Sequence, residues 1–108
     1  MAAPWGLAIT DHHRKGSPVV FVNQAFEFIS GHKADETLGK NWRCLLGRDP
    51  ESHTLARVRD AVGKGNHCSV VLRSAGKDGS RVHNELTIAP LLNRFGDVTH
   101  LSWLCRDI

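Results

Sequence analysis

Hydrophobic and polar residues change their spacing partway along the chain. Before about residue 67 the apolar residues fall in short runs, whereas from Cys68 onward they alternate with polar ones. A spacing of two is typical of strands with one buried face, so we expect three strands, beginning near Cys68, Val82 and Val98.

The alternation also assigns each side chain to a face. The inward-facing sets are Cys68, Val70, Leu72 and Ser74, then Val82, Asn84, Leu86 and Ile88, and finally Thr99, Leu101, Trp103 and Cys105. The last strand then places Val98, His100, Ser102 and Leu104 on the outer face. Asn84 stands out as a polar amide on a face that is otherwise dry.

The first half of the chain predicts a hairpin followed by short helices. Strands are expected at 6–10 and 19–22, and Asn23 is placed to cap a helix that ends at Gly31. A second short helix covers 34–38. A third is expected to start at Asp49-Pro50, and its apolar face carries Leu55, Val58, Ala61 and Val62. Hairpin turns are expected at 75–79 and 93–97.

Between these helices lies a segment bounded by Gly39 and Gly47, with Asn41 as a potential cap and Trp42 at its centre. It predicts one or two helical turns that close a pocket. The whole order is α+β: a five-stranded antiparallel sheet with short helices gathered on one face. Such a fold encloses a cavity between sheet and helices, and Asn84 is expected to point into it.

Composition limits the possible functions. The 108 residues fit a single domain, 1–108, and an apolar fraction of 41% is typical of a globular chain. No run of about eighteen apolar residues and no secretory signal is present, so we expect a cytoplasmic domain without a membrane partner. The net charge of +3 is scattered without a basic stripe, which argues against direct nucleic-acid binding.

Reactive or metal-binding patterns are also missing from the sequence. The three cysteines form no CxxC pair, and the seven histidines show no ligand spacing. No nucleophile elbow or P-loop occurs, so we expect no enzymatic activity and no metal.

Several segments together resemble the PAS superfamily and, within it, the flavin-binding light-oxygen-voltage (LOV) branch. They are residues 18–26, 31–32, 38–43, 57–62, 77–79, 84–86 and 106–108, and they follow the family order over almost the whole chain. The resemblance implies the PAS fold and a sensory role.

The reactive helix of the LOV family reads Asn-Cys-Arg-Phe-Leu-Gln, and residues 41–46 here read Asn-Trp-Arg-Cys-Leu-Leu. In the family that Cys adds to the flavin after excitation by blue light, and Trp42 occupies its position. The resemblance therefore implies that the cysteinyl-flavin photocycle is lost. Cys44 lies two residues on, about 200° around a helix, and is not expected to replace it.

At the other pocket positions of the LOV family, this chain keeps some of the family's residues and replaces others. The resemblance assigns Arg43 and Arg59 to the FMN phosphate and Asn41 and Asn84 to hydrogen bonds with the ribityl chain and ring. The altered pocket positions are Trp42, Leu46, Ser74, Trp103 and Cys105. Because two indoles fill roughly the bulk of a flat ring, we expect FMN to be absent or weakly bound.

Outside the LOV comparison, plain structural roles stay open. Arg43 and Arg59 could be solvated charges on helix surfaces, or one of them could pair with Asp60 or Glu36 instead. Asn84 could form hydrogen bonds with the backbone or with a trapped water.

The resemblance implies a signal-transduction module without catalysis, which forms a homodimer through the outer sheet face using Val71, Val98 and Leu104. It also implies a larger signalling protein with an output domain such as a histidine kinase. The alternative is an FMN-binding photoreceptor or redox sensor that works without the cysteine.

Overall fold

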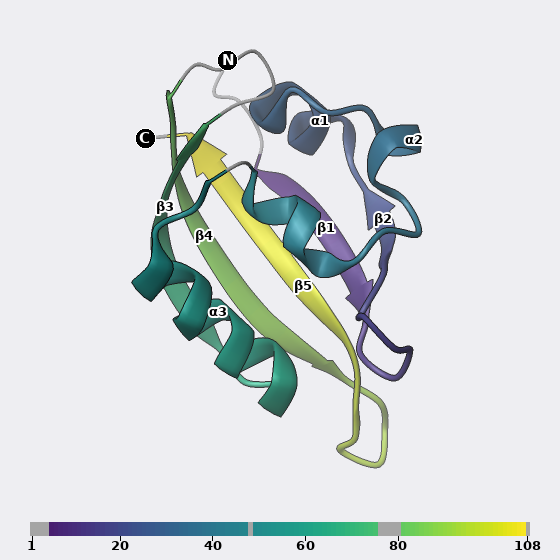
Figure 1. The fold of residues 1–108 in the computed structure, drawn as a ribbon. Coiled ribbons are helices and arrows are strands. Elements are labelled where there is room, and N and C mark those ends of the chain that lie inside the picture. The colour runs from purple at the N-terminus through teal and green to yellow at the C-terminus, as the bar shows by residue number, and fades with distance from the viewer. Residues whose placement is uncertain (1–4, 48, 76–80, 108) are drawn as a thin grey trace.

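A single antiparallel sheet forms the body of the domain (Figure 1). The structure is a computed structural model, and it describes residues 5–47, 49–75 and 81–107. The strands lie in the order β2-β1-β5-β4-β3. They are β1 (Gly6–Asp11), β2 (Val19–Val22), β3 (Cys68–Ala75), β4 (Arg81–Leu92) and β5 (Val98–Asp107). The α+β class and the five antiparallel strands are thus confirmed.

Short helices cover one face of this sheet. They are α1 (Gln24–Ser30), α2 (Ala34–Thr37), the 3₁₀ helix η1 (Trp42–Leu46) and α3 (Ser52–Lys64). In Figure 1 η1 lies over the middle of the sheet, and α3 lies beside β3 and β4. No helix in the described ranges is long and apolar enough to cross a membrane.

The predicted cap of α1 is confirmed, and it also ties the helix to the sheet. Asn23 Oδ1 accepts hydrogen bonds from the Phe26 N–H at 2.8 Å and from the Leu7 N–H at 2.9 Å. The helix ends at Gly31, whose φ of 78° is left-handed. A glycine reaches that conformation without the strain that a Cβ would cause.

The predicted start of α3 is wrong. Asp49 takes a left-handed φ of 52°, and the helix begins at Ser52 with Glu51 as its N-cap residue. The residue before a proline is disfavoured in helical conformation, so Pro50 separates Asp49 from the helix instead of opening it. The helix also passes through Gly63 and ends at Gly65.

The predicted orientation of Val98 is wrong as well. The register of β4 with β5 runs from Leu91–His100 to Leu92–Val98, which leaves Thr99 as an extra residue in a β-bulge. A bulge shifts the alternation by one residue. Val98 therefore packs against the core, within reach of Gly65 at the end of α3.

The hairpin turn predicted at 93–97 is confirmed, since the Asn93 N–H donates to the Asp97 carbonyl at 2.9 Å. The turn predicted at 75–79 falls largely on residues 76–80, outside the described residues.

The core lies between the inner face of the sheet and the helices. Its largest fully buried side chains are Trp103, Leu46, Leu86, Ile88, Leu101, Val19, Val58 and Thr10. Except for Thr10 they are apolar, and the members from β4 and β5 are those that the alternation placed inward.

Candidate functional site

The 3₁₀ helix η1 brings Trp42 onto the sheet. Asn41 Oδ1 accepts a hydrogen bond from the Arg43 N–H at 3.0 Å, and the Trp42 N–H donates to the Gly16 carbonyl at 3.3 Å. These bonds fix the start of η1. Trp42, Leu45 and Leu46 are buried, whereas Arg43 is exposed and Cys44 is half-buried.

Trp42 packs against Trp103 at the centre of the inner face of the sheet. Trp103 lies on β5 between Ala8 of β1 and Ile88 of β4, and it is fully buried. The two indoles stack with ring centroids 6.0 Å apart and planes 22° from parallel. Such a pair contributes about 0.5–1.5 kcal/mol beyond the area that it buries.

The indole N–H of Trp103 finds a partner that sequence reasoning missed. Trp103 Nε1 donates to Thr10 Oγ1 at 2.9 Å, and Thr10 is fully buried on β1. A buried indole needs an acceptor, and an inward-facing hydroxyl on the neighbouring strand supplies one. The signal was available, because period-two counting places Thr10 on the same face as Ala8.

Cys105 lies on the inner face next to the indoles, two residues after Trp103. Burial, with a smaller contribution from the charge of Asp107, raises the pKa of its thiol to about 11. Burial also raises the pKa of Cys44, although the nearby Lys40 opposes the shift. Both thiols are therefore neutral at pH 7, which lowers their nucleophilicity.

Asn84 is buried and incompletely hydrogen-bonded. Only 4% of the residue is exposed, and its Oδ1 has no hydrogen-bond partner in the described part of the chain. A buried acceptor left in this state costs about 1–3 kcal/mol. The orphaned oxygen is the feature of this site that points most directly to a guest molecule.

Asn84 does not lie beside the two indoles. Asn84 precedes Ile88 by four residues on β4, and Ile88 is the residue opposite Trp103. About 13 Å of strand therefore separates Asn84 from Ile88. The inner face therefore has an aromatic region around Trp103 and a polar point at Asn84. Cys105 and Leu86 pair between them.

The other predicted cofactor contacts lie at the surface. Arg43 of η1 and Arg59 of α3 are exposed, and neither guanidinium pairs with another residue in the described ranges. Asp60, one of the two acids suggested as a partner for Arg43 or Arg59, instead forms an ion pair with Lys64 at 3.1 Å. Asn41 is exposed as the cap of η1. Ser74 pairs with Val82 in register, but its side chain lies outside what the structure describes.

Among the described residues no group of three or more His, Cys, Asp or Glu side chains could hold a metal ion.

The comparisons with known proteins agree with this fold. The family model described as "PAS domain" matches residues 6–108. The chain belongs to the PAS family.

Several of the similar proteins are named as blue-light photoreceptors or blue-light-activated histidine kinases. A blue-light photoreceptor of Listeria monocytogenes is 38% identical over 96 residues, which are 89% of this chain and 37% of the relative. Blue-light-activated histidine kinase 1 of Erythrobacter litoralis is 30% identical, covering 94% of this chain and 29% of the kinase. The chain thus spans about a third of the length of these relatives.

A solved structure extends the similarity to three dimensions. A structure titled "Flavin Analogue Sheds Light on Light-Oxygen-Voltage Domain Mechanism" superposes with a TM-score of 0.86 at 30% identity. It covers 98% of this chain and 78% of that one. The chain is therefore a PAS domain of LOV-like type, similar to blue-light photoreceptors and sensor kinases.

Proposed function

We propose that this chain, 1–108, is one sensory PAS domain that regulates a larger signalling protein without forming a cysteinyl-flavin adduct. The stack of Trp42 on Trp103 carries the proposal. In the LOV resemblance these are the positions of the reactive thiol and of a small last-strand residue. An indole has no sulfur to add to a flavin, and an indole on β5 occupies the space that a small residue leaves open.

The neighbouring thiols do not replace the lost one. Cys44 is half-buried, and burial raises its pKa. Cys105 lies on β5, with a pKa near 11. We therefore infer that no described cysteine near the stack supplies the missing nucleophile.

The residues of this site suit some parts of FMN and not others. The exposed guanidiniums of Arg43 and Arg59 suit a phosphate, and the unpartnered Asn84 Oδ1 suits a ring or ribityl donor. The ring itself does not fit where the two indoles stack, because a buried indole covers roughly 150–250 Å². We therefore propose that the domain works without a resident flavin.

One observation favours a second candidate function. The orphaned oxygen of Asn84 costs free energy in an empty domain, and a bound flavin would be able to satisfy it. In that case the domain is an FMN-binding photoreceptor or redox sensor that lacks the adduct, and FMN would supply light absorption and one-electron chemistry.

The visible spectrum of the purified protein separates the two candidates. We expect no flavin band near 450 nm and no FMN released on denaturation, as measured by mass spectrometry. One FMN per chain would reject the ligand-free function and support the second candidate.

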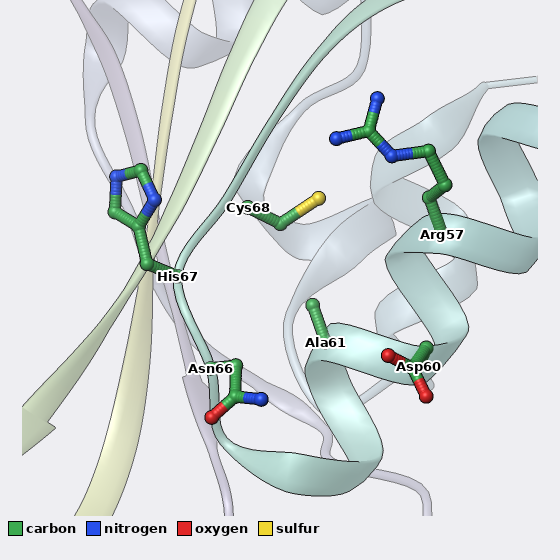
Figure 2. A pocket seen from close by; sticks show the side chains of 6 residues that line it. All are labelled: Arg57, Asp60, Ala61, Asn66, His67 and Cys68. Carbon is green, nitrogen blue, oxygen red and sulfur yellow. The ribbon is translucent and has the colours of Figure 1, made fainter.

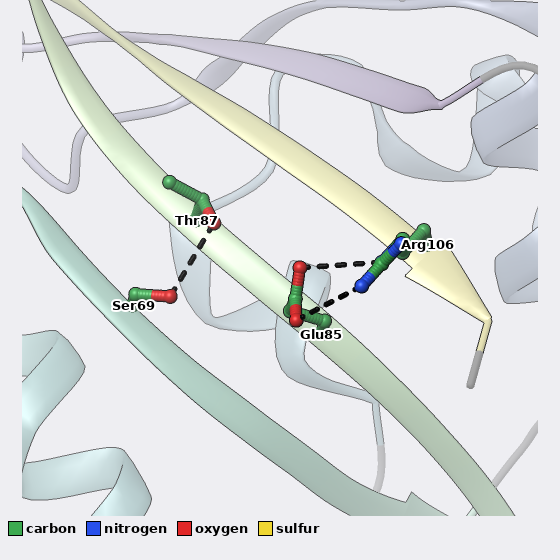
Figure 3. Close-up of polar contacts among 4 residues, drawn as sticks. All are labelled: Ser69, Glu85, Thr87 and Arg106. Atoms are coloured by element: carbon green, nitrogen blue, oxygen red, sulfur yellow. Dashed lines mark hydrogen bonds and ion pairs between the residues drawn. The ribbon is translucent and has the colours of Figure 1, made fainter.

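For output, we propose a homodimer formed by part of the outer sheet face. On the β2-β1-β5 side this face carries Phe21, Ile9, Leu7 and Leu104, and Phe21 is 44% exposed. The β3-β4 side is polar: Glu85 of β4 pairs with Arg106 at the end of β5 at 3.2 Å, and the Ser69 and Thr87 hydroxyls lie 3.4 Å apart (Figure 3). We therefore propose that the apolar β2-β1-β5 side of the outer face forms the contact between the two chains of the dimer.

This assignment changes the predicted dimer surface. Val98 faces inward, and Val71, although 40% exposed, lies on the polar side. A histidine kinase or comparable output domain in the same protein is the partner that the similar sensor kinases suggest. Cys44, Cys68 and Cys105 are all free, as suits the reducing cytoplasm that we propose for the domain.

A further inference from the structure

Three surface segments meet at the end of the domain where β1 and β4 finish (Figure 1). They are the β1–β2 turn (12–17), the end of α3 (63–67), which leads into β3 through Asn66 and His67 (Figure 2), and the β4–β5 turn with the residue before it (92–97). The His12 N–H donates to the Thr99 carbonyl at 3.0 Å, which joins the first segment to β5. A Cβ on Gly65 would lie 3.3 Å from both the His12 ring and Val98, so the end of α3 lies against both strands. We call these three segments the loop end.

The β4–β5 turn extends farther than the other two segments of the loop end (Figure 1), and its backbone is held by several hydrogen bonds. Asn93 Oδ1 accepts hydrogen bonds from the Phe95 N–H at 2.8 Å and from the Asp97 N–H at 3.0 Å. The Gly96 N–H donates to the Asn93 carbonyl at 3.1 Å. The turn is therefore preformed, and a partner that binds its side chains does not have to order the backbone first.

Two large apolar side chains are exposed on this turn. Phe95 is 75% exposed and Leu92 is 59% exposed. Leu92 pairs in register with Val98, which packs against the core, but Leu92 itself lies beyond the part of the sheet that the helices cover. Neither side chain contributes to the core. Exposed apolar side chains that are bordered by charge are typical of contact sites.

Positive charge borders these two side chains. The guanidinium carbon of Arg94 lies 5.0 Å from the centre of the Phe95 ring. Arg14 and Lys15 are exposed on the neighbouring β1–β2 turn. Phe95 therefore projects from a surface whose nearest exposed charges include three cations.

Acidic side chains offset this charge only in part. Lys64, the fourth cation of the loop end, forms an ion pair with Asp60 at 3.1 Å. Asp11, at the end of β1, accepts a hydrogen bond from the His13 N–H at 3.0 Å. Within the loop end itself the four cationic side chains are opposed by one acidic side chain, Asp97.

We propose that the loop end binds the surface of an anionic lipid bilayer. Phe95 and Leu92 enter the boundary between headgroups and acyl chains, while Arg94, Arg14 and Lys15 contact the lipid phosphates. Long cationic side chains suit this position because their stems are apolar and their charged ends reach the headgroups. A projecting turn enters a headgroup layer easily, whereas it offers a globular protein only a narrow area of contact.

This proposal revises the expectation that the domain has no membrane partner. That expectation rested on the lack of a long apolar run, which bears on spanning a bilayer and not on contact with its surface. The cytoplasmic leaflet carries anionic lipids, so the surface is available to the cytoplasmic domain proposed above. Because only two apolar side chains enter, the binding is weak and reversible.

Sedimentation of the whole chain with lipid vesicles tests the proposal. We expect binding to vesicles of equal parts phosphatidylserine and phosphatidylcholine, and none to phosphatidylcholine alone. Phe95→Ala should lower the affinity about tenfold, because it removes much of the apolar surface that enters the bilayer. Phe28→Ala is the matched control: Phe28 is 91% exposed on α1, away from the loop end, and its loss should leave the affinity unchanged. Absence of binding, equal binding to both kinds of vesicle, or equal losses in the two variants overturns the proposal.

A second pair of variants tests the charges. The double variant Arg14→Gln, Lys15→Gln should bind the phosphatidylserine vesicles about tenfold more weakly or worse. The double variant Lys33→Gln, Arg73→Gln also removes one Lys and one Arg, both exposed and outside the loop end, and should bind as the unchanged chain does. Equal affinities of the two double variants would reject the assigned surface.

Removing the acid of the loop end adds a gain of binding that misfolding cannot imitate. Asp97→Asn should bind the phosphatidylserine vesicles more tightly, because the carboxylate no longer repels the lipid phosphates. Unchanged or weaker binding by this variant contradicts the proposal. None of these affinities depends on the flavin spectrum, so this proposal and the proposed function fail separately.

Discussion

The indole of Trp42 stacks on the indole of Trp103, with centroids 6.0 Å apart and planes that differ by 22°. One residue comes from a short 3₁₀ helix and the other from the strand at the centre of the sheet. The contact therefore joins the two layers of the domain at the place where the LOV resemblance puts a flavin ring.

The hydrogen bond from Trp103 to Thr10 can be tested by a double-mutant cycle. Trp103→Phe leaves the buried Thr10 hydroxyl without its donor, so we expect a loss of about 1–3 kcal/mol from this term, in addition to lost packing. In a Thr10→Val background the same replacement should cost less. Urea unfolding of the four proteins measures the coupling, and purely additive effects would contradict the assigned bond.

Replacing Asn84 with Leu should stabilise the ligand-free domain. The change removes an orphaned buried oxygen and keeps a side chain of similar size, so the free energy of unfolding should rise by roughly 1 kcal/mol. Asn23→Leu is the matched control. It should destabilise, because Asn23 Oδ1 accepts two backbone hydrogen bonds. A destabilising effect of Asn84→Leu, together with loss of a bound chromophore, would favour the flavin-binding alternative.

Opening the aromatic region should create a flavin site. In the double variant Trp42→Cys, Trp103→Gly we expect FMN, added during refolding, to bind and to raise the melting temperature. The unchanged chain should show no such rise. The double variant will be less stable without ligand, since removing a buried Trp typically costs about 3–5 kcal/mol. Equal FMN binding by both proteins would show that the indoles do not obstruct the ring.

Stability should fall at alkaline pH because of Cys105. Its pKa is about 11 in the folded chain against an ordinary value of 9.0, so the folded state favours the neutral thiol. The stabilisation is complete below pH 9 and is lost as pH rises toward 11, at up to about 1.4 kcal/mol per pH unit. Urea unfolding between pH 8 and 11 should show a smaller decline in Cys105→Val. Parallel declines would contradict this linkage.

The proposed dimer depends on Phe21. Phe21→Arg should convert the dimer to a monomer in light-scattering chromatography, because it places a charge in the apolar part of the outer face. Phe28→Arg is the control, since Phe28 is 91% exposed on α1 and lies away from that face. A dimer that survives the first change, or dissociates equally in both, is not formed by this surface.

Local patterns were sufficient for much of the fold. Alternation along 101–105 correctly placed Leu101, Trp103 and Cys105 inward, because side chains on a strand must alternate. Asn23 was recognisable as a cap for a similar reason, since its hydrogen bond to Phe26 spans only three residues.

Relations between distant segments were less predictable. Val98 was misplaced because the bulge at Thr99 arises from pairing between β4 and β5, and alternation within one strand does not reveal it. Similarly, Pro50 and the left-handed Asp49 moved the start of α3 to Ser52. The helix preferences of single residues do not predict the left-handed conformation of Asp49, and that conformation keeps Asp49 out of the helix.

The sequence by itself determined most of the side chains that enter the core, because burial follows the period of strands and helices; Val98 is an exception. The resemblance to LOV proteins aligns Trp42 with the position of their reactive thiol. Only the tertiary structure decided that Trp42 stacks on Trp103, that Thr10 accepts the indole N–H, and that Asn84 Oδ1 has no described partner. These three facts depend on strand register and on how η1 packs against the sheet, which are set by the whole chain together.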